Sequence, residues 1–87
     1  MFFDNNNIKS ITIPKSVRKM SRYGLYSCEK LTEITILSRD IEFEDNWVTK
    51  CENLKVIRVQ REIYDFVSAM FIDNDAIKIK KINRLFH

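Results

Sequence analysis

The sequence repeats itself at one fixed interval, and this period limits the possible folds more than any other feature. The phrase "IKSITI" at 8–13 returns as "LTEITI" at 31–36 and as "LKVIRV" at 54–59. The period of about 23 residues falls in the range of roughly 20–50 residues that is typical of repeat architectures. The aligned apolar columns are Ile8/Leu31/Leu54/Ile77, Ile11/Ile34/Ile57, Ile13/Ile36/Val59, Met20/Phe43/Phe66 and Leu25/Val48/Phe71.

One column of the repeat is polar rather than apolar. It consists of Asn5, Cys28, Cys51 and Asn74, which are separated by the same interval. Each unit then ends in an alternating stretch rich in Ile, Val and Thr, which predicts a half-buried strand. Because equivalent strands recur at equal spacing, each should lie parallel to the last. The chain would then coil as a solenoid.

The segments between these strands carry a short apolar pair in each unit. The pairs are Val17/Met20, Ile41/Phe43 and Ile63/Phe66. After each pair we expect a single helical turn, because Ser21, Asp45 and Ser68 are residue types that cap helix N-termini. The predicted fold class is an α/β-type repeat solenoid, with three to four parallel strands on one face and short strands or helical turns on the other.

The repeat resembles a known family, the BspA-type leucine-rich repeats. The stretch "ITIPKSVRKMSRYGLYSCEKLTEITI" at 11–36 is similar to the pattern IxIPxSVxxI…AFxxCxxLxxIxI, with Gly24 and Leu25 in place of Ala-Phe. The second unit lacks Pro-x-Ser-Val and carries Trp47 at the small position. The third has Lys80 where an inward Ile belongs, so either the register slips there or the repeat ends.

The resemblance implies a single leucine-rich-repeat domain over residues 1–87. Its quasi-repeats are expected at about 1–13, 14–36, 37–59 and 60–87, with the last unit degenerate and capping. The family resemblance also implies a binding scaffold rather than an enzyme.

Composition narrows the possible functions further. The hydrophobic content of 45% suffices for a packed core, and no run approaches the roughly 20 apolar residues that span a bilayer. The N-terminal stretch predicts no signal peptide, so we expect a cytoplasmic protein with reduced cysteines and no membrane partner. The net charge of +3 comes from the end of the chain, where four basic residues and no acid follow Asp75.

No constellation in the sequence predicts catalysis, a metal or a cofactor. Cys28 and Cys51 could suggest a disulfide or metal site, but they hold equivalent repeat positions, and the single histidine is His87. We interpret them as buried, stacked, inert thiols. Alternation with Ile41 and Phe43 places the acidic residues of 40–45 on the solvent side of a short strand.

The residues that flank the inward columns are the candidate partner-binding site. They should point outward from one continuous sheet, which is the surface that solenoids use for partners. The partner-binding candidates are Thr12, Glu33, Thr35, Val56, Arg58 and Gln60, with Ser10 beside them. A merely solvated face is the alternative.

Two other groups of residues allow both a structural and a functional interpretation. Trp47, Tyr23, Tyr26 and Tyr64 either cover the core or mark an interface. The terminal "KIKKINRLFH" either caps the open end of the core or forms a basic patch. That patch consists of Lys78, Lys80, Lys81 and Arg84.

These observations predict a non-enzymatic protein–protein interaction module, such as a small intracellular adaptor or a phage-type inhibitor of a host enzyme. The alternative is a protein that binds nucleic acid or phosphate through the basic C-terminal segment. Self-association through the open edges of the solenoid is a third possibility.

Overall fold

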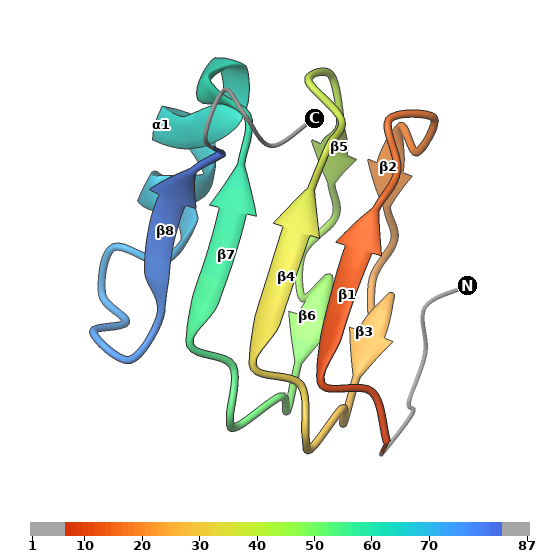
Figure 1. Ribbon diagram of the computed structural model, residues 1–87, viewed down its shortest axis with the longest axis vertical. Coiled ribbons are helices and arrows are strands. Elements are labelled where there is room, and N and C mark those ends of the chain that lie inside the picture. Colours follow the sequence, from red (N-terminus) through yellow and green to blue (C-terminus); the bar gives the residue numbers. More distant parts are fainter. Residues whose placement is uncertain (1–6, 83–87) are drawn as a thin grey trace.

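The computed structural model describes residues 7–82, and its main element is a four-stranded parallel sheet. Figure 1 shows the four strands side by side, from the N-terminal strand at one edge to the C-terminal strand at the other. In spatial order they are β1 (Ser10–Ile13), β4 (Glu33–Ile36), β7 (Val56–Val59) and β8 (Lys78–Lys81). The predicted parallel strands are therefore present.

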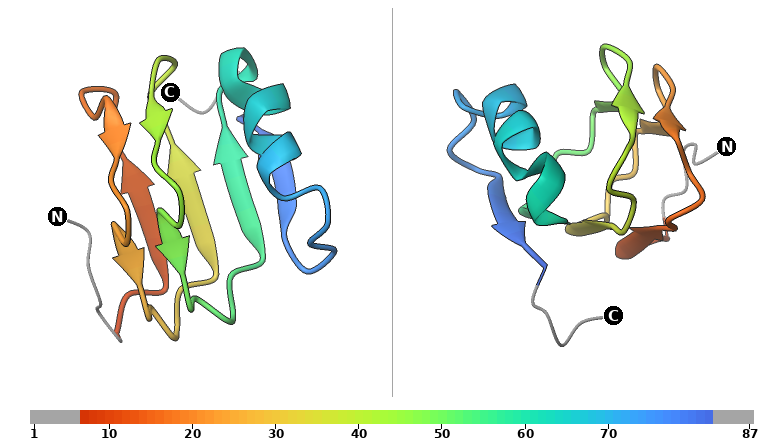
Figure 2. Two further views of the ribbon diagram at one scale, coloured as in Figure 1. Left: turned by 180° about the vertical axis from the view of Figure 1, so that it is seen from behind. Right: turned by 90° about the horizontal axis from the view of Figure 1, so that it is seen from above.

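A second layer of short strands and one helix lies behind this sheet (Figure 2). The short strands form two parallel pairs, β2 (Lys19–Met20) with β5 (Glu42–Phe43) and β3 (Leu25–Tyr26) with β6 (Val48–Thr49). Helix α1 (Arg61–Met70) follows β7 and contacts β7 and β8. The core lies between the two layers.

The inward columns of the repeat form that core. Ile34 and Ile57 pair with each other across adjacent strands and are completely buried, as are Ile13, Ile36 and Val59. Full burial of one such side chain contributes about 1.5–3 kcal/mol. Stacking them in register between the two layers gives the sheet its main source of stability.

The backbone repeats along with the side chains in the first two full units, at about 14–36 and 37–59. Non-glycine residues with positive φ occur at Tyr23 and Asn46 and again at Ser27 and Lys50, each pair one repeat period apart. The Tyr23 N–H donates to the Asn46 carbonyl at 2.8 Å, and the Ser27 N–H donates to the Thr49 carbonyl at 2.9 Å. The left-handed residues therefore form the same corner in both coils.

The predicted single helical turns are wrong in these two units. Hydrogen-bonded turns stand in their place, such as the one closed by the Gly24 N–H and the Ser21 carbonyl at 2.8 Å. A turn suffices because each corner has only to lead from one short strand into the next. Ser21 and Asp45 therefore cap no helix.

The third unit departs from the first two by forming a ten-residue helix in place of two short strands. The N-cap of α1 is Gln60, without a side-chain capping bond, and Ser68 lies inside the helix rather than at its start. Its hydroxyl is buried and forms no hydrogen bond within the described residues. Ile63 and Val67 anchor the helix to the core.

The register of the sheet slips by one residue in the last unit. Ile34 and Ile57 are one full period apart, whereas Ile57 pairs with Ile79 instead of with Lys80, the residue that a full period would bring to this position. The turn before β8 still follows the longer period, because the Ile77 N–H donates to the Asn74 carbonyl as Leu54 does to Cys51. Of the two alternatives at Lys80, a slipped register or the end of the repeat, the structure has the slipped register. Lys80 pairs with Arg58 and points outward.

Candidate functional site

The outward side of the four-stranded sheet, here called the front face, consists of two rows of side chains. Strand pairing joins Ser10, Glu33, Val56 and Lys78 in one row and Thr12, Thr35, Arg58 and Lys80 in the other. The rows begin with small hydroxyls on β1 and end with ammonium groups on β8. The front face is therefore neutral at one edge and basic at the other.

An ion pair crosses the middle of this face. Arg58 Nη1 on β7 lies against Glu33 Oε1 on β4, and both side chains are partly exposed. A pair in such a setting contributes about 1 kcal/mol or less to folding. Its larger consequence is for the surface charge, because the two groups neutralise each other and leave Lys78 and Lys80 to set its sign.

Thr35 is the neighbour of both members of this ion pair in the strand register. It is paired with Thr12 on one side and with Arg58 on the other, and only 8% of it is exposed. The Arg58 side chain extends diagonally from the position opposite Thr35 to Glu33. Among the predicted contact residues, Thr35 offers the least surface to a partner.

Gln60 has a contact of its own inside the protein. Its Nε2 donates to the Leu37 carbonyl at 3.2 Å, which joins the chain after β7 to the chain after β4. This bond accounts for the missing side-chain cap on α1, since the amide is used between coils. Val56 is half-buried in the first row, between Glu33 and Lys78.

The structure divides the predicted basic patch. Lys78 and Lys80 belong to the front face, whereas Lys81 occupies the inward register and its Nζ lies 4.9 Å from the centre of the Tyr64 ring on α1. Such a cation–π contact contributes about 0.5–1 kcal/mol at an exposed site. Arg84 lies outside the described residues. The segment is thus both a sheet edge and an extension of the front face.

The two cysteines occupy equivalent positions and form no disulfide. Cys28 is buried and Cys51 half-buried, and the Cys51 Sγ lies 3.6 Å from the Thr49 carbonyl oxygen and 3.8 Å from that of Leu25. Burial raises the pKa of the Cys51 thiol. A thiol held in its protonated form is a poor nucleophile. Within residues 7–82, no cluster of His, Cys, Asp and Glu could hold a metal ion.

The acidic residues of 40–45 lie on the solvent side, as their alternation predicts. Asp40 pairs with Arg18 at 3.5 Å, and Glu44 pairs with Lys19 at 3.5 Å. The Glu44 carboxylate also accepts a hydrogen bond from the Arg22 backbone N–H at 2.9 Å. This bond, followed by the Lys19 charge, lowers the pKa of Glu44 below its ordinary value.

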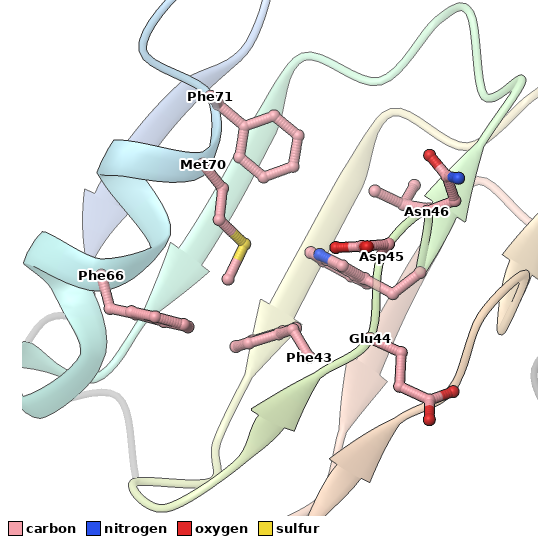
Figure 3. A pocket seen from close by; sticks show the side chains of 9 residues that line it. Phe43, Glu44, Asp45, Asn46, Phe66, Met70 and Phe71 are labelled. Carbon is pink, nitrogen blue, oxygen red and sulfur yellow. The ribbon is translucent and has the colours of Figure 1, made fainter.

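A concavity that sequence reasoning missed lies on the side of the molecule opposite the front face. It has a volume of about 400 Å³ and lies between the β5–β6 coil and α1 (Figure 3). We call it the aromatic groove. It is lined by Phe43, Glu44, Asp45, Asn46, Trp47, Val48, Phe66, Met70 and Phe71.

The aromatic residues of the chain are divided between core and surface. Trp47 is buried, with its ring 4.8 Å from that of Phe43 and 6.2 Å from that of Phe71. Tyr26 and Tyr64 are half-buried, and Tyr23 is exposed against Tyr26. Covering the core therefore accounts for Trp47 and leaves Tyr23 on the surface.

A signal for the groove was present in the sequence. Ile63, Phe66, Val67 and Met70 follow the three-and-four spacing of an amphipathic helix, but Ile63 and Phe66 also match the apolar pair of the preceding units. The match to the preceding units predicts a short strand here, and that prediction is wrong because the segment forms α1, which borders the groove.

Parallel strands at a fixed interval, joined by a layer of short strands, define a repeat protein with one extended sheet face. The profile of the BspA-type leucine-rich repeat region (6 copies) matches residues 1–85, and the chain belongs to this family. Leucine-rich repeats generally mediate protein–protein interactions and are typically non-enzymatic. No curated protein and no solved structure matches the chain.

The structure also shows whether its helix could cross a membrane. Over residues 7–82, the one helix is too short and too polar to cross a bilayer.

Proposed function

We propose that the chain is a short leucine-rich-repeat solenoid that binds a protein partner through its front face. The observation that carries this proposal is the register of β8, which places Lys78 and Lys80 in the same two rows as Glu33 and Arg58. Four adjacent parallel strands thereby present one continuous surface, of the kind that repeat proteins use for recognition.

The charge of the front face indicates the chemistry of the partner. The Arg58–Glu33 pair is internally neutral, and no ion pair involves Lys78 or Lys80 within the described residues. A partner that places carboxylates opposite β8 and small or polar groups opposite β1 would complement this gradient. Charge complementarity of this type governs specificity and association rate more than affinity.

Affinity purification followed by mass spectrometry tests the proposal, with charge reversals on the front face as the discriminating variants. Arg58→Glu and Lys80→Glu should each weaken capture of the recovered partner, and Glu33→Lys should alter it. Lys50→Glu is the matched control, because Lys50 lies over the Tyr26 ring on the opposite side. Recovery of no partner, or of one indifferent to all three reversals, would overturn the assignment of this face.

Within this proposal the protein acts in the cytoplasm, as an adaptor or as a phage-type inhibitor of a host enzyme. Two cysteines that lie in adjacent coils without forming a disulfide fit a reducing compartment. The two roles differ in an assay of the captured partner. An inhibitor abolishes enzymatic activity at a one-to-one ratio, whereas an adaptor leaves it unchanged and recruits a further protein.

Nucleic-acid or phosphate binding is the second candidate, and the proximity of Lys78 and Lys80 to Arg58 favours it. Against it, Lys81 is turned toward Tyr64, which reduces the outward charge. Binding to a phosphate backbone releases counterions, so the logarithm of affinity should fall linearly as the logarithm of salt concentration rises. A flat salt response, or no binding at low salt, excludes this candidate.

Self-association is the remaining possibility, and the two sheet edges differ in their support for it. β8 carries three lysines, which discourage pairing between edges, whereas β1 carries Ser-Ile-Thr-Ile. A dimer would therefore form through β1. Light scattering that shows a strict monomer at high concentration removes this possibility.

A further inference from the structure

We propose that the aromatic groove is a second docking site, which binds an amphipathic protein segment carrying a lysine or arginine beside its apolar side chains. The groove lies behind the four-stranded sheet, so this inference does not rest on the proposed function of the front face.

The groove exists because the rear layer does not continue into the third unit. Each rear sheet stops after two strands, at β5 and β6, and after β7 the chain returns to the rear layer as α1. Figure 2 shows α1 beside the β5–β6 coil instead of paired with it. A third pair of short strands would have closed the space.

The floor and walls of the groove are apolar and partly open to solvent. Trp47 forms the buried floor, whereas Phe66 is 58% exposed. Phe43 spans the two, with ring centres 4.8 Å from Trp47 and 6.1 Å from Phe66. Figure 3 shows Phe66, Met70 and Phe71 on the helical side, across from Phe43. A large aromatic exposed at the edge of an apolar concavity is typical of a surface that a partner covers.

The edge of the groove is acidic on the β5–β6 side. Glu44 and Asp45 both line it, together with Asn46. The Glu44 carboxylate is occupied by Arg22 and Lys19, and Figure 3 shows it pointing away from the aromatic side chains. Asp45 is exposed and forms no ion pair within the described residues. It is therefore the carboxylate that selects a cation on the incoming segment.

The local charge of the groove distinguishes specific peptide binding there from non-specific adsorption of a peptide to the protein surface. The whole chain carries a net charge of +3, so indiscriminate electrostatics would favour an acidic peptide. A preference for a basic peptide therefore requires a local acidic site, which the edge of the groove supplies. The occupant we infer therefore combines apolar anchors for Phe43 and Phe66 with a positive charge for Asp45.

Three synthetic peptides without tryptophan serve as probes. The first is a leucine–lysine amphipathic peptide, the second carries glutamate in place of each lysine, and the third is a scrambled form of the first. Trp47 is the single tryptophan of the chain and lies in the groove, so its fluorescence reports occupancy directly. Titration calorimetry on the same samples provides an independent reading.

We expect the leucine–lysine peptide to saturate and to bind at least about tenfold more tightly than the other two peptides. Phe66→Ala should weaken it by about tenfold, because it removes an exposed aromatic ring that the peptide would cover. Asp45→Lys should remove the preference for lysine over glutamate. Both side chains are exposed, so thermal unfolding should confirm that each variant remains folded.

Two control variants separate the groove from other surfaces. Ile72→Ala removes an exposed apolar residue that does not line the groove and should leave binding unchanged. Lys80→Glu lies on the front face and should not weaken it. Equal affinity for the three peptides, or wild-type affinity in both Phe66→Ala and Asp45→Lys, would overturn the proposal.

Discussion

The first two coils and the last unit fold from the same repeat, yet only the first two obey it. In the coils that run from β1 to β7, the strands, the left-handed corners and the short rear strands all recur at the repeat period. In the last unit the turn at Asn74 still recurs, but a helix replaces the rear strands and β8 arrives one residue early.

This difference shows that one layer of a repeat protein can continue the repeat while the other layer ends. The front sheet continues through the last unit because a one-residue slip places Ile79 beside Ile57 and leaves Lys80 outside. The rear layer ends at β5 and β6 because Phe66, which shares the register of Met20 and Phe43, belongs to α1. The irregular unit thereby supplies both the basic edge of the front face and one wall of the aromatic groove.

The largest loss of stability should come from truncating a side chain in the regular core. Ile34→Ala empties a completely buried position between β1 and β7, so it should lower the free energy of unfolding by about 2–5 kcal/mol. Ile79→Ala truncates a half-buried side chain on the edge strand β8 and should cost less. Urea unfolding measures both, and equal costs would show that the last unit is as tightly packed as the coils.

Exchanging charge and apolar character in β8 tests the register slip. Ile79→Lys places an ammonium group in the inward column and should cost about 2 kcal/mol, whereas Lys80→Ile should stay within about 0.5 kcal/mol of wild type. An unbroken repeat period predicts the reverse, with Lys80→Ile stabilising and Ile79→Lys harmless. The two melting temperatures decide between these registers.

Glycine substitutions at one repeat position should have different effects in the two regions. Asn46 and Ala69 share a register, but Asn46 has a φ of 59° at a corner and Ala69 lies within α1. Ala69→Gly should cost about 1 kcal/mol, because glycine weakens a helix interior. Asn46→Gly should change stability by less than about 0.5 kcal/mol, because glycine tolerates positive φ. A cost for both of similar size would argue against the left-handed corner.

The smallest expected effect is on the pH dependence of stability. It comes from the hydrogen bond between the Arg22 N–H and the Glu44 carboxylate, which joins the corners of the two coils. The pKa of Glu44 is lowered from 4.5 by the Arg22 N–H and Lys19, so its contribution to stability is complete above that pH and disappears as the pH falls through the lower folded value. The advantage of wild type over Glu44→Gln should therefore vanish in acid. Val67 occupies the position equivalent to Glu44 in the last unit, so the hydrogen bond has no counterpart there.

Glu52→Gln, which removes an exposed turn carboxylate, is the control for the acid series. Thermal melts between neutral pH and about pH 3 should show no comparable change for this variant. A pH-independent difference between wild type and Glu44→Gln would mean that the Arg22 contact does not depend on the charge of the carboxylate.

The sequence predicts the regular part of this structure well because one physical constraint acts there. Parallel strands at equal spacing require apolar columns, and Ile34 and Ile57 stand where the columns place them. The alternation that predicts outward residues also locates Glu33 and Arg58, although not their ion pair. That contact depends on a diagonal side-chain conformation, which no column encodes.

The last unit could not be derived in the same way because its residues fit two patterns. Ile63 and Phe66 match both a strand pair and the face of a helix, and only packing against β7 and β8 selects the helix. The run "KIKKI" alternates in two registers, and the one observed turns Ile79 rather than Lys80 toward the core. Local sequence leaves such choices to tertiary contacts.

The most direct test of this account is a solution NMR measurement of the last unit. Cross-strand nuclear Overhauser effects should connect Ile57 with Ile79 and Arg58 with Lys80, and chemical shifts over Arg61–Met70 should be helical. Contacts from Ile57 to Lys80, together with extended shifts over Arg61–Met70, would contradict it. The groove and the basic edge of the front face would then both be lost.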